Sequence, residues 1–144
     1  MMAKVVAINI SEEKGVPKKT VETGELIVEH GLKGDAHAGN WHRQVSFLGL
    51  ESIEKMKALG IKGLCTGKFA ENITTEGIEL YTLPIGTRLA IGDSLLEVTQ
   101  IGKECHQKCA VFHQVGHCVM PKEGIFARVL KGGTIKAGDS IQVL

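Results

Sequence analysis

The sequence is short of aromatic residues, which make up 4% of its 144 positions, with one Trp, one Tyr and four Phe. This shortage argues against the stacking platforms with which proteins bind single-stranded nucleic acid. The charges are nearly balanced, with 17 Lys and Arg against 16 Asp and Glu, so the positive excess of nucleic-acid binders is also missing. No run approaches the roughly 18 to 20 apolar residues that span a bilayer. We therefore expect neither a nucleic-acid partner nor a membrane partner.

Several other signatures are missing. The first apolar run, residues 5–10, is too short for the core of a signal peptide, so we expect a cytoplasmic protein. In that reducing compartment the four cysteines are expected to be thiols rather than disulfides. Phosphate-loop, dinucleotide-binding and serine nucleophile-elbow motifs do not occur. The length fits one domain, which we place at residues 1–144.

The chain does contain many short apolar runs separated by glycine turns. Such a pattern predicts a mainly β fold, a closed or partly open β-barrel with a few short helices. The strands are expected at residues 5–10, 24–29, 44–48, 88–91, 95–101 and 141–144. Helices are expected at residues 51–60 and 124–130, where apolar residues share one face and glycine follows.

A short internal echo supports the β interpretation. Gly-Asp-Ser occurs at residues 92–94 and again at residues 138–140, each time between two extended runs. Because Gly and Asp tolerate positive φ, both segments are predicted to be tight hairpin turns.

Three of the four cysteines are crowded into one segment that directly follows the predicted strand 95–101. Cys105 has Lys103, His106 and Lys108 as sequence neighbours, and positive charge stabilises the reactive thiolate. Cys65 stands apart and is interpreted as a small buried apolar residue.

The cysteine segment has three possible interpretations. The first is a structural zinc site with the spacing C-x3-C-x3-H-x4-C, which lacks the usual C-x2-C knuckle. The second is a single reactive or metal-binding cysteine with bystanders. The third is a thiol-rich loop without chemistry. The zinc ligands would be Cys105, Cys109, His113 and Cys118.

Two further polar segments are candidate binding loops. In residues 34–44, Arg43 could hold a phosphate or carboxylate through its planar donors, or be an ordinary surface charge. His37 and His42 in the same segment could instead be metal ligands, although no His-Glu-x-x-His motif is present. In residues 67–77, Glu71 and Asn72 either brace a site or cap a turn.

Six segments, taken in order, resemble the MOSC domain, the family named for the carboxy-terminal domain of molybdenum cofactor sulfurase. The resemblance extends over nearly the whole chain, from about Val5 to Leu144, and the sequence looks like a small stand-alone bacterial member. The matching segments are residues 34–37 (GDAH), 43–46 (RQVS), 69–73 (FAENI), 83–86 (LPIG), 100–105 (QIGKEC) and 124–129 (GIFARV).

This resemblance implies a β-barrel that binds the molybdenum cofactor, a molybdopterin. It places the family's hallmark cysteine, as catalytic residue and molybdenum ligand, at Cys105, with Cys109 and Cys118 as less favoured ligands. A soft thiolate is a sensible ligand for molybdenum held by pterin sulfurs. The implied pocket residues are Arg43 and Arg128 for the pterin phosphate, and Asp35, His37, Glu71 and Asn72 along the wall.

The implied activities are sulfur carriage on Cys105 or molybdenum-dependent reduction of N-hydroxylated compounds. The implied partners are proteins of molybdenum-cofactor biosynthesis or molybdenum enzymes, with an external electron donor in the reductase case. The family also carries an association with pyridoxal phosphate binding. The alternative from another class is a zinc-stabilised β module for interaction, without catalysis. This sequence has Ala70 where the family often has glycine before Glu-Asn. From its length we do not expect the amino-terminal β domain that accompanies the reductase members.

Overall fold

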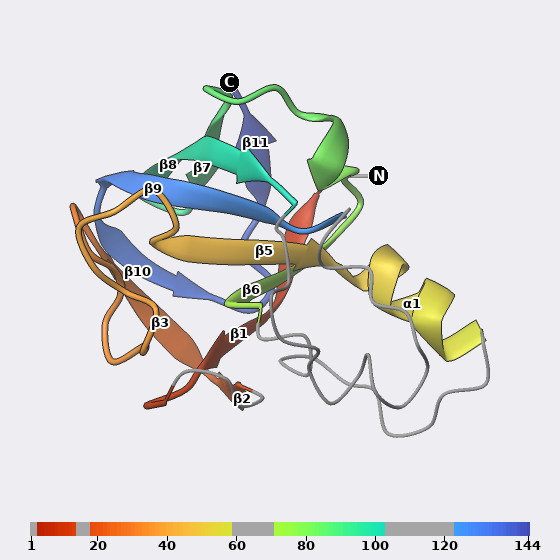
Figure 1. Cartoon of the computed structure of the whole chain (residues 1–144), viewed down its shortest axis with the longest axis horizontal. Helices are drawn as coiled ribbons and strands as arrows, with labels where there is room; N and C mark the ends of the chain where they lie inside the picture. The colour runs from red at the N-terminus through yellow and green to blue at the C-terminus, as the bar shows by residue number, and fades with distance from the viewer. Residues whose placement is uncertain (1–2, 14–17, 59–70, 103–122) are drawn as a thin grey trace.

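The computed structural model describes residues 3–13, 18–58, 71–102 and 123–144. Its strands form an eight-stranded sheet in the order β11-β7-β8-β9-β5-β6-β1-β2 and a three-stranded sheet in the order β10-β3-β4. Within these described residues, the strands are accompanied by the helix α1 and the short 3-10 helix η1 (Figure 1). The strands are β1 (Lys4–Ile10), β2 (Lys19–Val21), β3 (Thr23–Ile27), β4 (Gly31–Leu32), β5 (Val45–Gly49), β6 (Ile73–Glu76), β7 (Arg88–Ile91), β8 (Ser94–Ile101), β9 (Ile125–Lys131), β10 (Gly133–Lys136) and β11 (Ile141–Val143). The helices are α1 (Leu50–Ala58) and η1 (Leu80–Thr82).

The larger sheet curls back on itself. Val5 N donates to Asp139 O at 2.8 Å, and Gly138 N donates to Val5 O at 2.7 Å. These bonds tie β1 to the segment that enters β11, although the two strands lie near opposite ends of the sheet order. The predicted partly open β-barrel is therefore confirmed, and Figure 1 shows the curved sheet around its interior.

The interior is filled by aliphatic side chains and one phenylalanine. Along β5, Val45 and Phe47 are fully buried in this core, so Ser46 between them points to the opposite face of the sheet. The same alternation places Ile73 in the core and the neighbouring Asn72 and Thr74 on the opposite side of the sheet, where they are also buried. The polar side of these strands is where the site residues lie.

The predicted helix over residues 124–130 is wrong, because this segment is strand β9. Ile125, Ala127 and Val129 are buried in the core, and the residues between them point outward. A repeat of two is the strand period, and it outweighs the apparent helical spacing. Gly132 also has a role other than ending a helix, because a Cβ there would lie 2.6 Å from Leu26 O.

One of the two predicted hairpins is confirmed and the other is wrong. Ile91 pairs with Ser94 across the turn from β7 to β8, where Gly92 has a φ of 56°. The second turn does form, at Gly138 with a φ of 95°. The two strands that this turn connects do not pair with each other, however, because β10 pairs with β3 and β11 pairs with β7.

The remaining predicted strands are found within a few residues of their expected bounds. The predicted helix at residues 51–60 is α1, which buries Ile53 and Met56, and its expected end lies outside the described residues. Within the described part of the chain, no helix is long and apolar enough to cross a membrane.

Candidate functional site

Asn72 is the centre of a hydrogen-bond network on the outer side of β1, β5 and β6. Its Oδ1 accepts from Ser46 N at 2.9 Å and from Ser46 Oγ at 3.1 Å. Its Nδ2 donates to Asn9 O at 3.2 Å. Asn72 is fully buried, so both functional groups of its amide hold neighbouring strands together in place of water.

Glu71 belongs to the same network. Its Oε2 accepts from Thr74 Oγ1 at 2.7 Å, and its backbone oxygen accepts from Asn9 Nδ2 at 3.2 Å. Asn9 Oδ1 in turn accepts from Thr20 Oγ1 at 2.7 Å. Glu71 is completely buried, with its carboxylate bound to Thr74 of β6 and its backbone oxygen bound to Asn9 of β1.

Asp35 forms a buried ion pair that the sequence did not indicate. Lys18 Nζ lies 2.7 Å from Asp35 Oδ1, and both side chains are 0% exposed. Ser11 N and His37 N also donate to the carboxylate, each at 3.1 Å. Burial alone would raise the pKa of the Asp35 carboxyl, but the hydrogen bond and charge of Lys18, with a hydrogen bond from Asn72, hold it below its ordinary value. Asp35 is thus held as a carboxylate.

His37 is bound to the same ammonium group. Its Nδ1 lies 3.0 Å from Lys18 Nζ, and its backbone oxygen accepts from Trp41 Nε1 at 2.9 Å. Asn72 also contacts Asp35. The fold therefore brings together four residues predicted for the site, from two segments far apart in the sequence: Asp35 and His37, and Glu71 and Asn72. We name this set the buried polar cluster: Asn9, Ser11, Lys18, Asp35, Ser46, Glu71, Asn72 and Thr74, which are buried, together with the half-buried His37 at its edge.

Sequence reasoning missed Lys18, Asn9 and Ser46. Lys18 follows a run of lysine, glycine, valine and proline that reads as a surface turn, and nothing in that pattern signals a buried cation. Asn9 and Ser46 did leave a signal, because each is a polar residue within an apolar strand segment.

Arg43 lies over β8 and β9, where it contacts Gln100 and Phe126. Its Nε donates to Gln100 Oε1 at 3.0 Å, and its guanidinium lies 5.1 Å from the centre of the Phe126 ring. Gln100 Nε2 donates to Gly102 O at 2.7 Å, so the amide oxygen is the group that meets Arg43 and His42 Nε2. The remaining guanidinium donors of Arg43 are not used by these contacts.

Arg128 is not part of the buried polar cluster. It is half exposed on the outer side of β9, where Nη2 lies 2.9 Å from Glu97 Oε1. Glu97 also lies 3.8 Å from Arg88 Nε, so one carboxylate faces two guanidinium groups.

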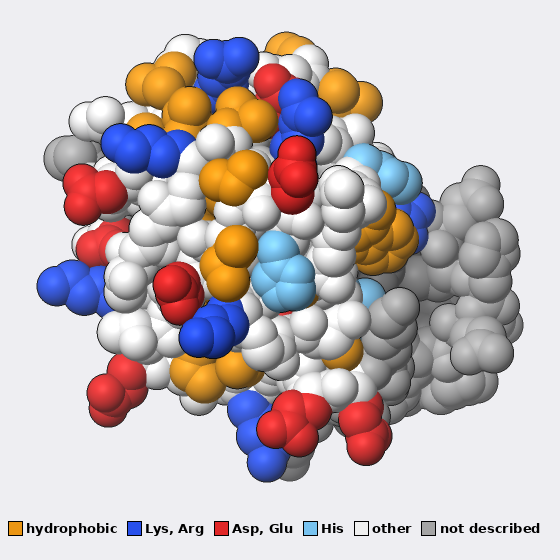
Figure 2. Space-filling model, turned by 90° about the vertical axis from the view of Figure 1, so that its left-hand side faces the viewer, with side chains coloured by type: hydrophobic (Ala, Val, Ile, Leu, Met, Phe, Trp, Pro, Cys, Tyr) orange, Lys and Arg blue, Asp and Glu red, His pale blue; other side chains and the backbone are white. Residues whose placement is uncertain are grey.

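Arg128 and Glu97 lie in a groove of about 500 Å³. Three of the exposed large hydrophobic side chains line it, namely Val28, Trp41 and Ile85. On the side of the molecule shown in Figure 2, hydrophobic side chains lie between charges of both signs, in keeping with the balanced composition.

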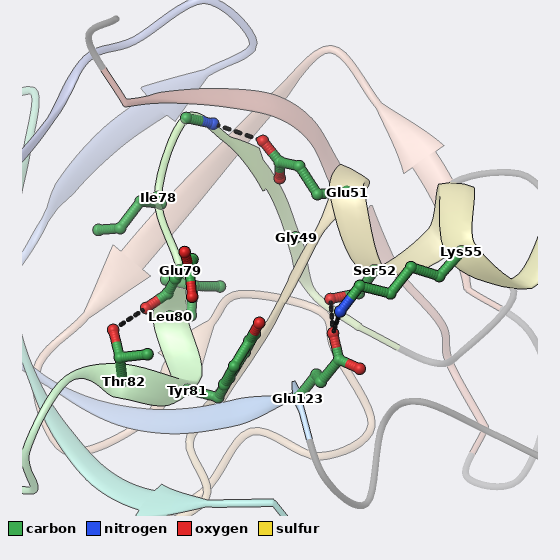
Figure 3. A pocket seen from close by; sticks show the side chains of 11 residues that line it. Gly49, Glu51, Ser52, Lys55, Ile78, Glu79, Leu80, Tyr81, Thr82 and Glu123 are labelled. Carbon is green, nitrogen blue, oxygen red and sulfur yellow. Dashed lines mark hydrogen bonds and ion pairs between the residues drawn. The ribbon is translucent and has the colours of Figure 1, made fainter.

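A larger cavity of about 640 Å³ lies beside α1 and η1 (Figure 3). Glu123 Oε1 accepts from Ser52 Oγ at 2.7 Å and from Lys55 Nζ at 2.8 Å. The hydrogen bond to Glu123 raises the pKa of Lys55. None of the residues predicted for the site lines this cavity, so the chemistry predicted from the sequence does not point to it.

The predicted catalytic and metal-binding cysteines lie outside the described residues. Cys105, Cys109 and Cys118 fall in residues 103–122, and Cys65 falls in residues 59–70. Gly102 is the last described residue before Cys105, and its N donates to Gly124 O at 2.6 Å. Among the described residues, no three His, Cys, Asp or Glu side chains are grouped to hold a metal ion.

Comparison with solved structures shows the same fold. YuaD of Bacillus subtilis aligns over 99% of this chain and 96% of its own, with a TM-score of 0.82 and 20% identity. YiiM of Geobacillus stearothermophilus aligns over 99% and 75%, with a TM-score of 0.72 and 19% identity. YiiM of Escherichia coli aligns over 100% and 70%, with a TM-score of 0.71 and 19% identity.

No curated protein sequence matches the chain significantly. The family model of the MOSC domain matches residues 34–142, a span that includes Asp35, His37, Arg43, Glu71, Asn72, Cys105 and Arg128. The family is associated with binding of the molybdenum cofactor. The match covers well over half of the sequence, and the chain therefore belongs to the MOSC domain family.

Proposed function

We propose that this chain binds the molybdenum cofactor against the outer side of β1, β5 and β6, with Cys105 supplying a thiolate ligand. The observation that carries the proposal is the convergence of Asp35, His37, Glu71 and Asn72 in one buried polar cluster. Such a network does not follow from packing the barrel, whose core lies on the other side of these strands. Buried polar networks of this kind hold side chains in fixed orientations, as a binding site requires.

The chemistry of the described donors fits an anionic ligand. Asp35 is neutralised by Lys18, so the negative charge of its carboxylate does not repel an anion nearby. Arg43 adds a guanidinium whose planar donors match a phosphate. In this proposal Arg43 holds the pterin phosphate, Arg128 is a second candidate for it, and His37 and Asn72 line the wall.

Two activities are open to this arrangement. In sulfur carriage, the Cys105 thiolate attacks the outer sulfur of a donor persulfide, forms its own persulfide, and releases the donor as a thiolate. In reductive chemistry, Cys105 would be a fixed molybdenum ligand, and the bound cofactor would pass two electrons to an N-hydroxylated compound, whose N–O bond is cleaved with uptake of two protons from water to give the amine and water. The two electrons then come from a separate redox protein.

The test is the composition of protein purified from a host that makes the cofactor. We expect molybdenum and pterin in equal amounts, with the metal measured by mass spectrometry and the pterin by fluorescence after oxidation. Absence of both from freshly purified wild-type protein would contradict the proposal. One zinc per chain without pterin would contradict it in favour of a zinc-stabilised module.

The two activities separate in a second measurement on the same sample. A mass increase of one sulfur on the peptide that contains Cys105 supports carriage. Reoxidation of the reduced, cofactor-loaded protein by benzamidoxime, with formation of benzamidine, supports reduction.

A further inference from the structure

The ammonium group of Lys18 has three hydrogens and three acceptors within the described residues. Nζ lies 2.7 Å from Asp35 Oδ1, 3.2 Å from Ser11 Oγ and 3.0 Å from His37 Nδ1. The Lys18 side chain is 0% exposed, so no exchange with bulk water competes for these hydrogens. Each N–H of the ammonium thus has one partner.

This arrangement determines which ring nitrogen of His37 carries the proton. An ammonium group only donates hydrogen bonds, so Nδ1 of His37 must accept. A neutral Lys18 amine could take a proton from Nδ1 instead, but it would leave the buried Asp35 carboxylate without its counter-charge. An uncompensated buried charge is strongly destabilising. His37 is therefore neutral, with its hydrogen on Nε2.

The backbone of His37 is also held, at both its nitrogen and its oxygen. His37 N donates to Asp35 Oδ2 at 3.1 Å, and the only tryptophan of the chain, Trp41, holds the backbone oxygen. The imidazole cannot turn over without losing its bond to a buried ammonium. Its orientation and its tautomer are set together, before any ligand binds.

We propose that Lys18 is a positioning residue that makes His37 Nε2 a hydrogen-bond donor, so that any group bound by Nε2, in the protein or in a ligand, is an acceptor such as an oxyanion or a thiolate, and not a cation. The ligand part of this inference rests on the proposed function, in which His37 lines the cofactor site. It excludes two other roles for the bound imidazole, because neither Nδ1 nor protonated Nε2 has a lone pair to offer to a metal or to a substrate proton.

The second predicted histidine follows the same rule. The Gln100 amide donates to Gly102 O, so its oxygen faces His42, and His42 Nε2 must donate to it. His42 Nδ1 keeps its lone pair in this arrangement, so a metal held by His37 and His42 together would require breaking the contact between His37 and Lys18 but not the contact between His42 and Gln100.

The first test is the tautomer of His37 in nitrogen-15 labelled wild-type protein at pH 7, from long-range proton–nitrogen correlation spectra. The signal is assigned by its absence in His37→Gln. We expect Nδ1 without a proton and Nε2 with one. A ring protonated at Nδ1, or at both nitrogens, overturns the inference.

The second test uses Lys18→Met and the exposed Lys33→Met as its control. In Lys18→Met we expect His37 to lose its single tautomer and the molybdenum content per chain to fall at least fivefold. In Lys33→Met we expect the tautomer and the molybdenum content to match those of the wild type. Unchanged tautomer and unchanged molybdenum in folded Lys18→Met contradict the positioning role. Molybdenum-free wild-type protein defeats the proposed function and the identity of the ligand, while the tautomer still tests Lys18 alone.

Discussion

Lys18 Nζ and Asp35 Oδ1 are 2.7 Å apart, and neither side chain is exposed to solvent. The pair joins the segment before β2 to the loop that carries His37, and it closes one side of the buried polar cluster. Because the charges are buried, the two partners depend on each other far more than surface ion pairs do.

Lys18→Met is expected to destabilise the fold by about 3–5 kcal/mol, because it leaves the Asp35 carboxylate buried without its counter-charge. Urea unfolding followed by circular dichroism measures this change. The control is Lys33→Met, since Lys33 is exposed and lies 3.9 Å from Glu25. It should shift stability by no more than about 0.5 kcal/mol. Equal effects of the two substitutions would show that the buried pair is not formed.

The same pair gives stability a defined pH dependence. The pKa of Asp35 is below its ordinary value of 3.8 in the folded protein, so at acid pH the unfolded chain takes up this proton first. The stabilisation is present above the unfolded pKa and is lost as the pH falls through the folded pKa. Between about pH 5 and pH 2, the wild type should lose more stability than Asp35→Asn, because the variant has no carboxyl group that titrates at this position. Parallel stability curves for the two proteins would refute the ionised state of Asp35.

Asn72→Ala removes both ends of a fully buried amide. Ser46 N and Asn9 O each lose a partner, and every such buried orphan costs about 1–3 kcal/mol, so a loss of about 2–5 kcal/mol is expected. Thermal or urea unfolding measures it. Asn40→Ala is the matched control, because Asn40 is exposed at the groove, and its stability should stay near that of the wild type. A stable Asn72→Ala protein would mean that this network is not formed.

Gly132→Ala tests the corrected assignment of β9. The added Cβ would lie 2.6 Å from the Leu26 backbone oxygen, and overpacking of this kind costs about 1–3 kcal/mol. Gly39→Ala is the control, since its Cβ would meet only Trp41, at an ordinary 3.8 Å. If residues 124–130 were a helix ended by glycine, this close approach to β3 would not exist and the two substitutions would cost about the same.

Arg43→Gln and Arg88→Gln separate a binding arginine from a surface one. Arg88 is more than half exposed and pairs with Glu97 at 3.8 Å, so its loss should change stability by less than about 1 kcal/mol and leave the molybdenum content unchanged. Arg43→Gln should lower the pterin and molybdenum content together, because it removes the planar donors assigned to the phosphate. Equal content in both variants would remove Arg43 from the site.

The barrel could be predicted because the sequence pattern of its strands and turns is visible locally. Val45 and Phe47 alternate with polar positions, and glycine marks the turn between β7 and β8. The segment of β9 was wrongly predicted to be a helix, because its apolar residues fit one face of a helix as well as a strand. These residues are Ile125, Phe126, Val129 and Leu130. Only pairing with β5 and β8 decides between the two. For the same reason, the second hairpin could not be predicted locally, as its strands belong to different sheets.

The candidate site was predictable only in part. Asp35, His37, Glu71 and Asn72 belong to motifs that resemble the family, and the fold brings them together. Lys18 belongs to no such motif, and its burial results from folding of the chain around Asp35. Arg128 belongs to the matching segment 124–129 and lies in β9, but it lines the groove beside Glu97 and is not part of the buried polar cluster. Spacing along the sequence does not indicate this placement.

The most direct measurement for the proposed function is the molybdenum content of Cys105→Ala beside that of Cys65→Ala, with both proteins made in the same cofactor-producing host as the wild type. We predict that Cys65→Ala keeps the wild-type molybdenum content and that Cys105→Ala loses most of its molybdenum, because only the second substitution removes the proposed thiolate ligand. Equal molybdenum per chain in the two variants would contradict the role of Cys105.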